Sequence, residues 1–425
     1  MIPKFDDYKK RFQLESKNAI EPGLDSITQA LKKVGNPHKK LQFVHVAGTN
    51  GKGSTIAMMN SMLQAHDIKT ACFYSPCFVD VHDQIQLNGL HITQEQMDHV
   101  CQLAKDAGIS GTVTDFELLT VLAFLAFEQF NPDIVLLETG MGGRFDSTNV
   151  IMPQISVIPS IGIEHEQFLG KTIEEVATHK AGIVKKGRPL VIGPLDQEAE
   201  QVMVIETAQQ QSPLWKINTD FILENRHYKD LAGHSFSNLS VPFHGPHQQN
   251  NAALAICTVI YIVEKLNLQV DEELIRIGLQ KAFIPGRFEK IADTLYFDGA
   301  HNPASAQALV DTITVVFQDT PIHFYLGMVE GKDAEKILRI FEKVSTIFTF
   351  IDFPDSRSMP SQKLSRISKA TIKCMTNEPV ENILETISKK HVTIVTGSLY
   401  LLANIRLKTL QIFENNKKLR DDKIF

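Results

Sequence analysis

The chain has 425 residues, of which 43% are hydrophobic and 22% are charged. At roughly 150 residues per domain, this length predicts two or three domains, each with a core of its own. The mean hydropathy of -0.08 is typical of a globular protein and excludes a fibrous or disordered chain. The longest apolar run, residues 118–127, is far shorter than the roughly 18–20 residues of a membrane-spanning helix, so we expect no membrane partner.

Charge and cysteine usage narrow the partners and the compartment. The chain carries 43 Lys and Arg against 49 Asp and Glu, and the formal net charge of -6 argues against a nucleic-acid partner. Five cysteines without a C-x-x-C pair favour a reducing compartment and argue against a disulfide framework or structural zinc. Residues 1–12 are charged and have no apolar core, so we expect no secretory signal. These features predict a cytoplasmic protein.

The first part of the chain alternates between β-rich runs and helical patterns. We expect strands at 41–47, 69–74, 134–138, 154–159 and 189–192, and helices at 54–67, 116–130 and 172–184. Glycine or polar turns separate these segments, and no internal repeat interrupts them. Strands that alternate with helices of this length indicate βαβ units and a parallel sheet covered on both faces.

The alternation stops between residues 214 and 243, where short β-prone pieces predict a small antiparallel insertion. Helices are expected at 248–266 and 271–282, and the sequence FIPGR at 283–287 then interrupts helical structure and marks a hinge. Afterwards the alternation restarts, with strands expected at 294–298, 322–327, 345–351 and 392–396. We therefore predict an α/β protein with two domains, residues 1–288 and residues 289–425.

A glycine-rich turn between the first expected strand and helix predicts a phosphate-binding loop. It consists of Gly48, Thr49, Asn50, Gly51, Lys52, Gly53 and Ser54. Glycines allow backbone N–H groups to close around phosphate oxygens, and a helix N-terminus and a lysine add positive charge. The strict G-x-x-x-x-G-K-[ST] pattern is not met, because Val46 replaces its first glycine and Gly53 separates Lys52 from the hydroxyl. A purely structural turn is the alternative.

A second glycine-rich turn, residues 138–146 (ETGMGGRFD), follows another expected strand. A dinucleotide-binding pattern would require glycine where Phe145 stands, so NAD binding is excluded here. Glu138, at the carboxyl end of that strand, is interpreted as a Mg²⁺ ligand, because Mg²⁺ prefers a few carboxylate or hydroxyl oxygens together with substrate phosphates. An ordinary acid at a strand end is the alternative.

Further polar residues stand at strand ends or within a helix. Glu164, His165 and Glu166 follow the next strand, and a lone histidine there is either a ligand or a solvated side chain. Lys180 lies one turn or more after Glu174 and Glu175, the spacing of a surface ion pair. In the second domain, the turns 298–303, 327–333 and 396–398 follow three strands and predict a ligand crevice at one sheet edge, with plain turns as the alternative.

Taken together, these segments resemble the folylpolyglutamate synthase and dihydrofolate synthase family of Mur-type ATP-dependent amide ligases. The resemblance rests on GTNGKGS, ETGMGGRFDSTNV, SIGIEHEQFLG, HKAGIVK, GPHQQNNAALA, PGRFE, DGAHNP and TGSLYLL, which occur in this order along nearly the whole chain. It implies a P-loop ATPase domain with a mostly parallel sheet and a smaller, Rossmann-like C-terminal domain for glutamate ligation.

The resemblance also implies roles for individual residues. Ser75, Glu138 and His165 match the Mg²⁺-binding positions, and Lys180 matches a lysine that is often carbamylated and then holds a second Mg²⁺. Contacts to nucleotide or substrate outside the phosphate loop are implied for His247, Gln248, Asn251, Arg287, Asp298 and His301. Two stretches depart from the family pattern: residues 77–84 carry acidic or neutral residues where arginines are expected, and Glu330-Gly331 precedes Lys332-Asp333.

The implied reaction adds L-glutamate to a folate at the expense of ATP, through an acyl phosphate. Its catalytic residues would be Lys52, His165, Lys180 and His301. Making dihydrofolate from dihydropteroate is a second activity of the family, and we expect a monomer that uses ATP and two Mg²⁺ ions. A Mur-type ligase for another carboxylic acid, a phosphate-loop kinase without amide formation and a non-catalytic relative remain alternatives.

Overall fold

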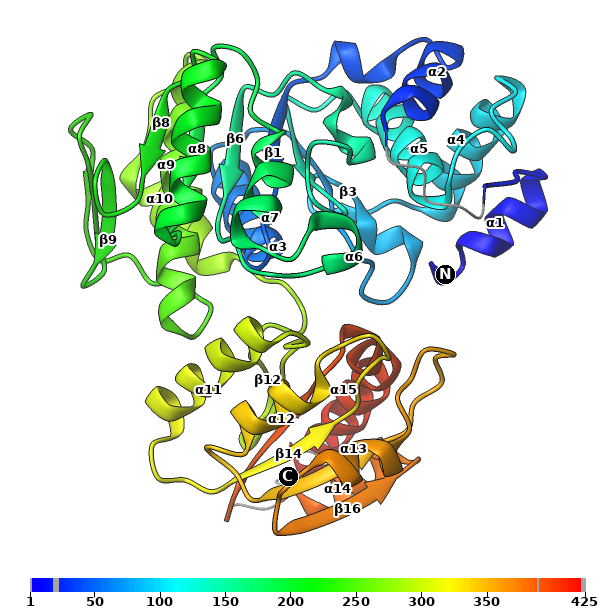
Figure 1. The fold of residues 1–425 in the computed structure, drawn as a ribbon, viewed down its shortest axis with the longest axis vertical. Helices are drawn as coiled ribbons and strands as arrows, with labels where there is room; N and C mark the ends of the chain where they lie inside the picture. Colours follow the sequence, from blue (N-terminus) through cyan, green and yellow to red (C-terminus); the bar gives the residue numbers. More distant parts are fainter. Residues whose placement is uncertain (1, 18–22, 388–389, 422–425) are drawn as a thin grey trace. The chain divides into compact units, whose positions relative to one another are not determined.

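The computed structural model describes residues 2–17, 23–387 and 390–421, which form two compact units (Figure 1). The first unit consists of Met1–Pro242 and His247–Phe283, and the second of Phe243–Pro246 and Ile284–Phe425. Residues 284–288, which we had assigned to the first domain, therefore belong to the second unit. The reason is aromatic packing, because the Phe288 ring lies 5.1 Å from the Tyr296 ring and 5.8 Å from the Phe317 ring.

The first unit is built on an eight-stranded sheet with the order β4-β3-β2-β5-β1-β6-β7-β8. Its strands are β1 (Phe43–Val46), β2 (Thr70–Phe73), β3 (Ile85–Leu87), β4 (Leu90–His91), β5 (Ile134–Glu138), β6 (Ile155–Ile158), β7 (Leu190–Ile192) and β8 (Leu214–Lys216). Neighbouring strands from β2 to β8 pair in parallel, and β3 and β4 add an antiparallel edge. The predicted mostly parallel sheet is confirmed. Its central strands are fully buried, as apolar runs covered on both faces require.

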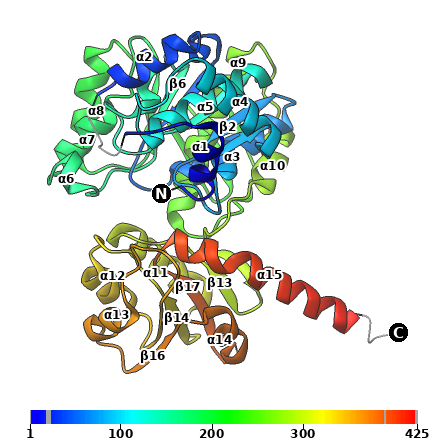
Figure 2. The ribbon, with the colours of Figure 1, turned by 90° about the vertical axis from the view of Figure 1, so that its right-hand side faces the viewer.

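Helices cover this sheet on both faces (Figures 1 and 2). They are α1 (Phe5–Phe12), α2 (Asp25–Lys33), α3 (Lys52–Ala65), α4 (Gln94–Asp106), α5 (Asp115–Phe130), α6 (Glu166–Leu169), α7 (Ile173–Ala181), α8 (Gln197–Gln209), α9 (Pro246–Lys265) and α10 (Glu272–Lys281), with 3-10 turns η1 (Pro37–Lys40), η2 (Val81–Gln84) and η3 (Ser147–Val150). Several helices begin where the sequence provides a capping box. Thr93, Thr114 and Thr172 each accept a backbone N–H of the first turn, which satisfies a donor that the helix leaves unpaired.

The antiparallel insertion is smaller than the sequence suggested. Its three-stranded sheet contains β9 (Phe221–Glu224), β10 (His227–Asp230) and β11 (Ser235–Phe236). Leu214–Lys216, which we had placed in the insertion, instead forms β8 and pairs in parallel with β7. A three-residue, half-exposed segment at a sheet edge shows no parallel-strand pattern of its own, so only its pairing with a distant strand assigns it.

The second unit contains a six-stranded sheet with the order β12-β13-β17-β14-β15-β16. Its strands are β12 (Glu289–Ala292), β13 (Leu295–Phe297), β14 (Ile322–Leu326), β15 (Ile347–Ile351), β16 (Ile372–Thr376) and β17 (Val392–Thr396), and its helices are α11 (Pro303–Phe317), α12 (Ala334–Phe341), α13 (Ser361–Ile367), α14 (Pro379–Thr386) and α15 (Leu399–Asp421). All strand pairs except β12–β13 are parallel, which confirms a second α/β unit. Figure 2 shows α15 extending beyond this sheet.

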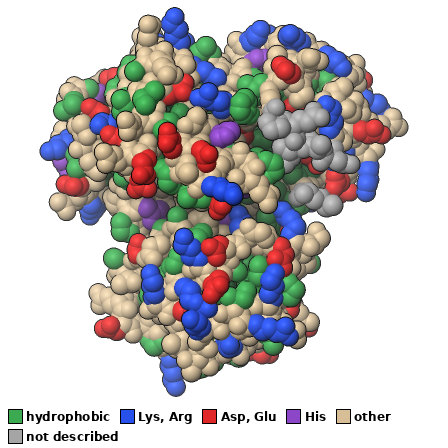
Figure 3. Space-filling view, viewed as in Figure 1, with side chains coloured by type: hydrophobic (Ala, Val, Ile, Leu, Met, Phe, Trp, Pro, Cys, Tyr) green, Lys and Arg blue, Asp and Glu red, His purple; other side chains and the backbone are tan. Residues whose placement is uncertain are grey.

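The cysteines, the surface charges and the helix lengths agree with what the composition predicts. All five cysteines are free thiols. On the face drawn in Figure 3, lysine and arginine side chains are mixed with aspartate and glutamate side chains over both units. Within the described ranges, every helix is too short or too polar to span a bilayer.

Candidate active site

The phosphate-loop candidate lies between β1 and α3, as the sequence predicts. Gly51 is the N-cap of α3 and has φ 88°, a left-handed conformation that favours glycine. A Cβ atom at Gly51 would lie 2.6 Å from Asn251 Oδ1, and one at Gly48 would lie 3.2 Å from both Pro159 and the Ser160 carbonyl oxygen. The close contact excludes a side chain at Gly51, and the neighbouring segment leaves little room for one at Gly48.

The segment that follows β6 supports this loop through hydrogen bonds. The Thr49 backbone N–H donates to the Ser160 carbonyl at 2.9 Å, and the Thr49 hydroxyl donates to the Gly162 carbonyl at 2.9 Å. The Asn50 N–H donates to the Ser160 hydroxyl at 3.0 Å. β1 and β6 are neighbours in the sheet, so the loop after one strand fixes the loop after the other.

The Lys52 ammonium is enclosed by the loop that precedes it. Its Nζ donates to the Gly48 carbonyl at 2.9 Å and lies 3.3 Å from the Thr49 carbonyl. The same atom is 3.9 Å from Glu138 Oε1. A cation at the N-terminus of a 14-residue helix is an arrangement suited to binding phosphate.

Glu138 and Ser75 meet at the carboxyl ends of two neighbouring strands, β5 and β2. Glu138 is 4% exposed, and its Oε2 accepts the Ser75 backbone N–H at 3.3 Å. The carboxylate thus has one oxygen toward Ser75 and the other toward Lys52. Carboxylate and hydroxyl oxygens beside a phosphate loop are the donor set that Mg²⁺ prefers, so these residues fit the ion.

Lys180 lies in the interior and not on the surface. Its side chain is 1% exposed, and its Nζ donates to Glu164 Oε1 at 2.7 Å. Burial lowers the pKa of Lys180 to about 8, although the Glu164 carboxylate opposes this shift. Burial would raise the pKa of Glu164, but the ammonium groups of Lys180 and Lys52 hold it below its usual value. Lys52, Glu164 and Lys180 therefore belong to one electrostatic cluster.

His165 follows Glu164 directly, as the N-cap of α6 with φ 49°. Its side chain is exposed. The part of the chain that the structure describes contains no group of three or more His, Cys, Asp or Glu side chains arranged to hold a metal ion. The metal set of Ser75, Glu138, His165 and Lys180 therefore stays a prediction. Because Mg²⁺ commonly takes only one or two protein carboxylates and completes its shell with phosphates and water, a small donor set remains compatible with it.

The start of α9 lies against the phosphate loop. Gln248 and Asn251 are buried, and the Asn251 amide donates to Gln248 Oε1 at 2.9 Å. The Gln248 amide lies 3.5 Å from the Ser54 hydroxyl, and Asn251 approaches Gly51. The structure thus brings two of the three expected α9 residues to the phosphate loop. His247 precedes them in the same helix.

In the second unit, Arg287, Asp298 and His301 occupy the ends of β12 and β13. The half-buried Asp298 carboxylate accepts the backbone N–H groups of Phe288 at 2.8 Å and of Ala300 at 2.9 Å. Burial raises the pKa of Asp298, and the Arg287 guanidinium opposes that shift. His301 Nδ1 lies 2.8 Å from the Gly299 carbonyl, which can only accept, so Nδ1 carries a proton.

The turns after β13 and β17 lie together, because the Gly397 N–H donates to the Ala300 carbonyl at 3.1 Å. Two of the three polar turns expected at this edge therefore meet. The third turn begins at Gly327, where a Cβ atom would lie 3.1 Å from the Leu401 side chain, and a Cβ atom at Gly397 would lie 2.6 Å from the Gly327 carbonyl oxygen. All three turns are neighbours at one end of the sheet.

Comparison with known proteins identifies the family. The Mur ligase middle domain matches residues 46–259, and the dihydrofolate synthetase C-terminal domain matches residues 287–409. The chain is 33% identical over 427 residues to the dihydrofolate synthase/folylpolyglutamate synthase of Bacillus subtilis (strain 168), covering 96% of this chain and 99% of that protein. The chain belongs to the folylpolyglutamate synthase/dihydrofolate synthase family.

Solved structures of this family share the fold. A folylpolyglutamate synthase from Thermotoga maritima superposes with a TM-score of 0.81 and 30% identity, covering 95% of this chain and 96% of that one. A bifunctional folylpolyglutamate synthase/dihydrofolate synthase with Mn, AMPPNP and L-glutamate bound gives a TM-score of 0.82 and 26% identity, covering 92% and 95%. The second of these relatives was therefore solved with an ATP analogue, a divalent metal ion and the amino acid.

Two acids near the candidate site, Glu164 and Asp146, were not predicted from the sequence to have a role in it. Glu164 was noted only as a neighbour of His165, yet it is the partner of Lys180. Asp146 is buried and accepts the Met141 N–H at 2.8 Å and the Thr148 N–H at 3.0 Å, so it closes the glycine-rich turn after β5. Both acids lie in loops well beyond the end of a strand, whereas Glu138 is the last residue of β5, so the strand-end signal that singled out Glu138 does not reach them.

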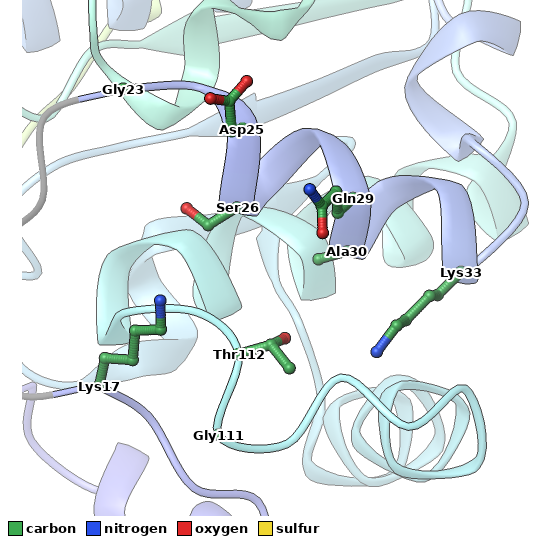
Figure 4. A pocket seen from close by; sticks show the side chains of 9 residues that line it. All are labelled: Lys17, Gly23, Asp25, Ser26, Gln29, Ala30, Lys33, Gly111 and Thr112. Carbon is green, nitrogen blue, oxygen red and sulfur yellow. The ribbon is translucent and has the colours of Figure 1, made fainter.

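A cavity of about 500 Å³ lies elsewhere in the first unit (Figure 4). Its walls come from α2 and from two short stretches of chain, and its lining residues are Lys17, Gly23, Asp25, Ser26, Gln29, Ala30, Lys33, Gly111 and Thr112. None of the predicted site residues lines it. The phosphate loop and not this cavity is the candidate active site, because the loop combines a glycine-rich backbone at a helix N-terminus with a buried acid and cations.

Proposed function

We propose that this chain is an ATP-dependent ligase that joins L-glutamate to a folate through an acyl phosphate, and that it also accepts dihydropteroate. Membership of the family supports the reaction class. The observation that supports the site most directly is the Lys52 ammonium, enclosed by the phosphate loop and 3.9 Å from the buried Glu138 carboxylate. The relative solved with AMPPNP, Mn and L-glutamate supports the three small ligands.

The reaction needs activation because a carboxylate is a poor electrophile. Transfer of the γ-phosphoryl group of ATP to the carboxylate gives an acyl phosphate with a good leaving group. The amine of L-glutamate then attacks the acyl carbon, and the intermediate collapses to an amide and inorganic phosphate. Phosphoryl transfer depends mainly on alignment and on neutralising negative charge. The phosphate loop orients the β- and γ-phosphates through its N–H groups, and Lys52 offsets their charge.

We assign Ser75 and Glu138 to one Mg²⁺ ion, and His165 and carbamylated Lys180 to a second. Bound Mg²⁺ would supply further positive charge at the phosphates. Ser75 and Glu138 are held for this role by their own hydrogen bond. The pKa of about 8 that burial gives Lys180 leaves part of its amine neutral near physiological pH, the form that reacts with carbon dioxide.

The remaining predicted residues orient the substrates. Gln248 and Asn251, with His247 beside them, would contact the nucleotide from α9, next to Gly51 and Ser54. For Arg287 and Asp298 we propose the ligand contacts that the family resemblance implies, and His301 would orient the incoming amine through its Nε2, because its Nδ1 is engaged with Gly299. We further propose a cytoplasmic monomer with no nucleic-acid partner, in line with the free cysteines and the net charge of -6.

One mass-spectrometric experiment tests the function. Purified protein receives ATP, Mg²⁺ and L-glutamate with tetrahydrofolate, with dihydropteroate or with no acceptor. We expect a glutamyl residue to be added to tetrahydrofolate and to dihydropteroate, with one phosphate released per amide, and no product in the Lys52→Ala chain. Phosphate release that does not depend on L-glutamate would indicate a kinase or ATPase instead. If neither tetrahydrofolate nor dihydropteroate gains a glutamyl residue, the proposed substrate class is contradicted.

A further inference from the structure

The loop between β2 and β3, residues 74–84, is folded by its own side chains. Two hydrogen bonds between Tyr74 and Gln84 close its base. The Tyr74 N–H donates to the Gln84 carbonyl at 2.9 Å, and the Gln84 side-chain amide donates to the Tyr74 carbonyl at 3.1 Å. At its tip, the Asp83 carboxylate accepts the N–H groups of Phe78 at 3.0 Å and Asp80 at 3.3 Å. The acidic residues that depart from the family pattern are therefore the residues that shape this loop.

The tip of the loop is also attached to the N-terminal helix α1. His82 Nδ1 lies 2.7 Å from Asp80 Oδ1, and His82 Nε2 lies 2.7 Å from the Tyr8 hydroxyl. Because the carboxylate can only accept, His82 donates from Nδ1, and in the neutral imidazole Nε2 then accepts a hydrogen bond from the Tyr8 hydroxyl. Lys4 Nζ adds an ion pair with Asp80 at 2.7 Å. We call Tyr8, His82 and Asp80 the tyrosine latch.

Burial and charge keep the protons of the latch in this arrangement. Tyr8 is 5% exposed, and burial raises its pKa above the usual value, so its hydroxyl stays a donor at neutral pH. Burial would raise the pKa of Asp80, but hydrogen bonds from Lys4 and His82 hold it below the usual value, so the carboxylate stays ionised. The latch is thus a directed chain of hydrogen bonds from α1 to the loop.

The loop starts beside the phosphate site. Its first residue after Tyr74 is Ser75, whose N–H contacts Glu138, and Glu138 lies next to Lys52. Gln248 and Asn251 of α9 approach the phosphate loop at other residues, Ser54 and Gly51. β3 and β8 lie toward opposite ends of the sheet, and the Trp215 ring of β8 lies 5.5 Å from the Tyr261 ring of α9, so this part of α9 packs at the end away from the loop (Figure 1).

The geometry of phosphoryl transfer indicates on which side of the γ-phosphate each substrate lies. The attacking and leaving oxygens lie roughly in line across the γ-phosphorus, so the acid acceptor and the nucleoside lie on opposite sides of it. With the nucleoside toward α9, the acceptor lies toward β2 and the loop that follows it. This assignment rests on the proposed function.

We propose that Tyr8 and His82 are positioning residues for the acid substrate, because the tyrosine latch holds loop 74–84 as the wall of the acceptor side of the site. α1 thereby acts on acceptor binding without touching the acceptor. A purely structural latch would affect stability, ATP use and acceptor use alike, whereas a positioning latch affects the acceptor alone.

The test compares two matched variants. Tyr8→Phe removes one hydroxyl and keeps the buried ring. Tyr228→Phe removes another buried hydroxyl, which donates to Asp230 at 3.2 Å in the three-stranded sheet. For Tyr8→Phe we expect KM for tetrahydrofolate to rise about three- to tenfold, the range of one lost hydrogen bond, with KM for ATP and kcat unchanged. Tyr228→Phe should change neither KM. His82→Ala combined with Tyr8→Phe should raise KM no further than His82→Ala alone, because both remove the same contact.

A second readout needs no activity. Amide hydrogen exchange of residues 78–83 in the nucleotide-free protein should speed up in Tyr8→Phe and stay unchanged in Tyr228→Phe. Unchanged exchange in Tyr8→Phe, an unchanged KM for tetrahydrofolate or an equal rise in KM for ATP would each overturn the proposal. A wild-type protein that transfers no glutamate to any acceptor would instead overturn the proposed function, while the exchange data would still judge the latch.

Discussion

Breaking the ion pair between Lys180 and Glu164 should destabilise the first unit. Lys180→Met keeps an apolar side chain in a site that is 1% exposed, but it leaves the Glu164 carboxylate, itself 16% exposed, without the cation that lies 2.7 Å away. Removing one partner of a buried pair costs about 3–5 kcal/mol. We expect the lower end, about 3 kcal/mol, because the Lys52 ammonium remains near Glu164 and continues to stabilise its charge.

The assay is urea unfolding followed by the fluorescence of Trp215, the only tryptophan of the chain, which lies in β8 of the first unit. Combining Lys180→Met with Glu164→Gln should recover at least half of the loss, because neither charge is then buried alone. As a control, Lys40→Met breaks an exposed pair with Glu128 and should cost less than about 1 kcal/mol. A Lys180→Met chain within about 0.5 kcal/mol of the wild type, the range of neutral surface changes, would refute the reasoning.

Three further outcomes follow from the same site. Lys52→Ala should abolish ATP-dependent phosphate release while the Trp215 unfolding midpoint stays near that of the wild type; turnover in this variant would remove the phosphate-loop assignment. Gly51→Ala should cost about 1–2 kcal/mol, because φ 88° disfavours a side chain, and should weaken binding of AMPPNP in calorimetry. The unfolded chain holds the Lys180 proton up to pH 10.5, whereas the folded chain releases it near pH 8. As the pH rises from 8 to 10.5, the unfolding free energy of the wild type should therefore increase relative to that of Lys180→Met. A difference in unfolding free energy that stays constant with pH would contradict the burial of this amine.

The sheets could be predicted from the sequence because their central strands are short apolar runs bounded by turns. β5, for example, spans Ile134–Glu138 as expected, with every residue buried. β16 was not expected, because Ile372–Thr376 lies at a sheet edge, is mostly exposed and mixes polar with apolar residues. Edge strands such as β8 and β16 are defined by the strand they pair with, and that partner lies far away in the sequence.

The position of the phosphate-loop candidate and of Glu138 could be predicted from the sequence because each stands at the end of a strand. The ion-pair partner of Lys180, in contrast, could not be predicted from the sequence. Helical spacing offered Glu174 and Glu175 as its partners, but Glu175 caps its own helix by accepting the N–H groups of Lys171 and Thr172. The true partner, Glu164, lies on another segment, and only the tertiary packing of α7 against it determines that contact.

The central claim is that the acceptor carboxylate becomes phosphorylated before glutamate attacks. The most direct test uses an acceptor whose reacting carboxylate carries oxygen-18, with ATP, Mg²⁺ and L-glutamate. If an acyl phosphate forms, its collapse leaves one carboxylate oxygen on phosphorus, so each amide should be matched by one inorganic phosphate that contains one oxygen-18 atom. Amide product accompanied by phosphate without the label would contradict the account.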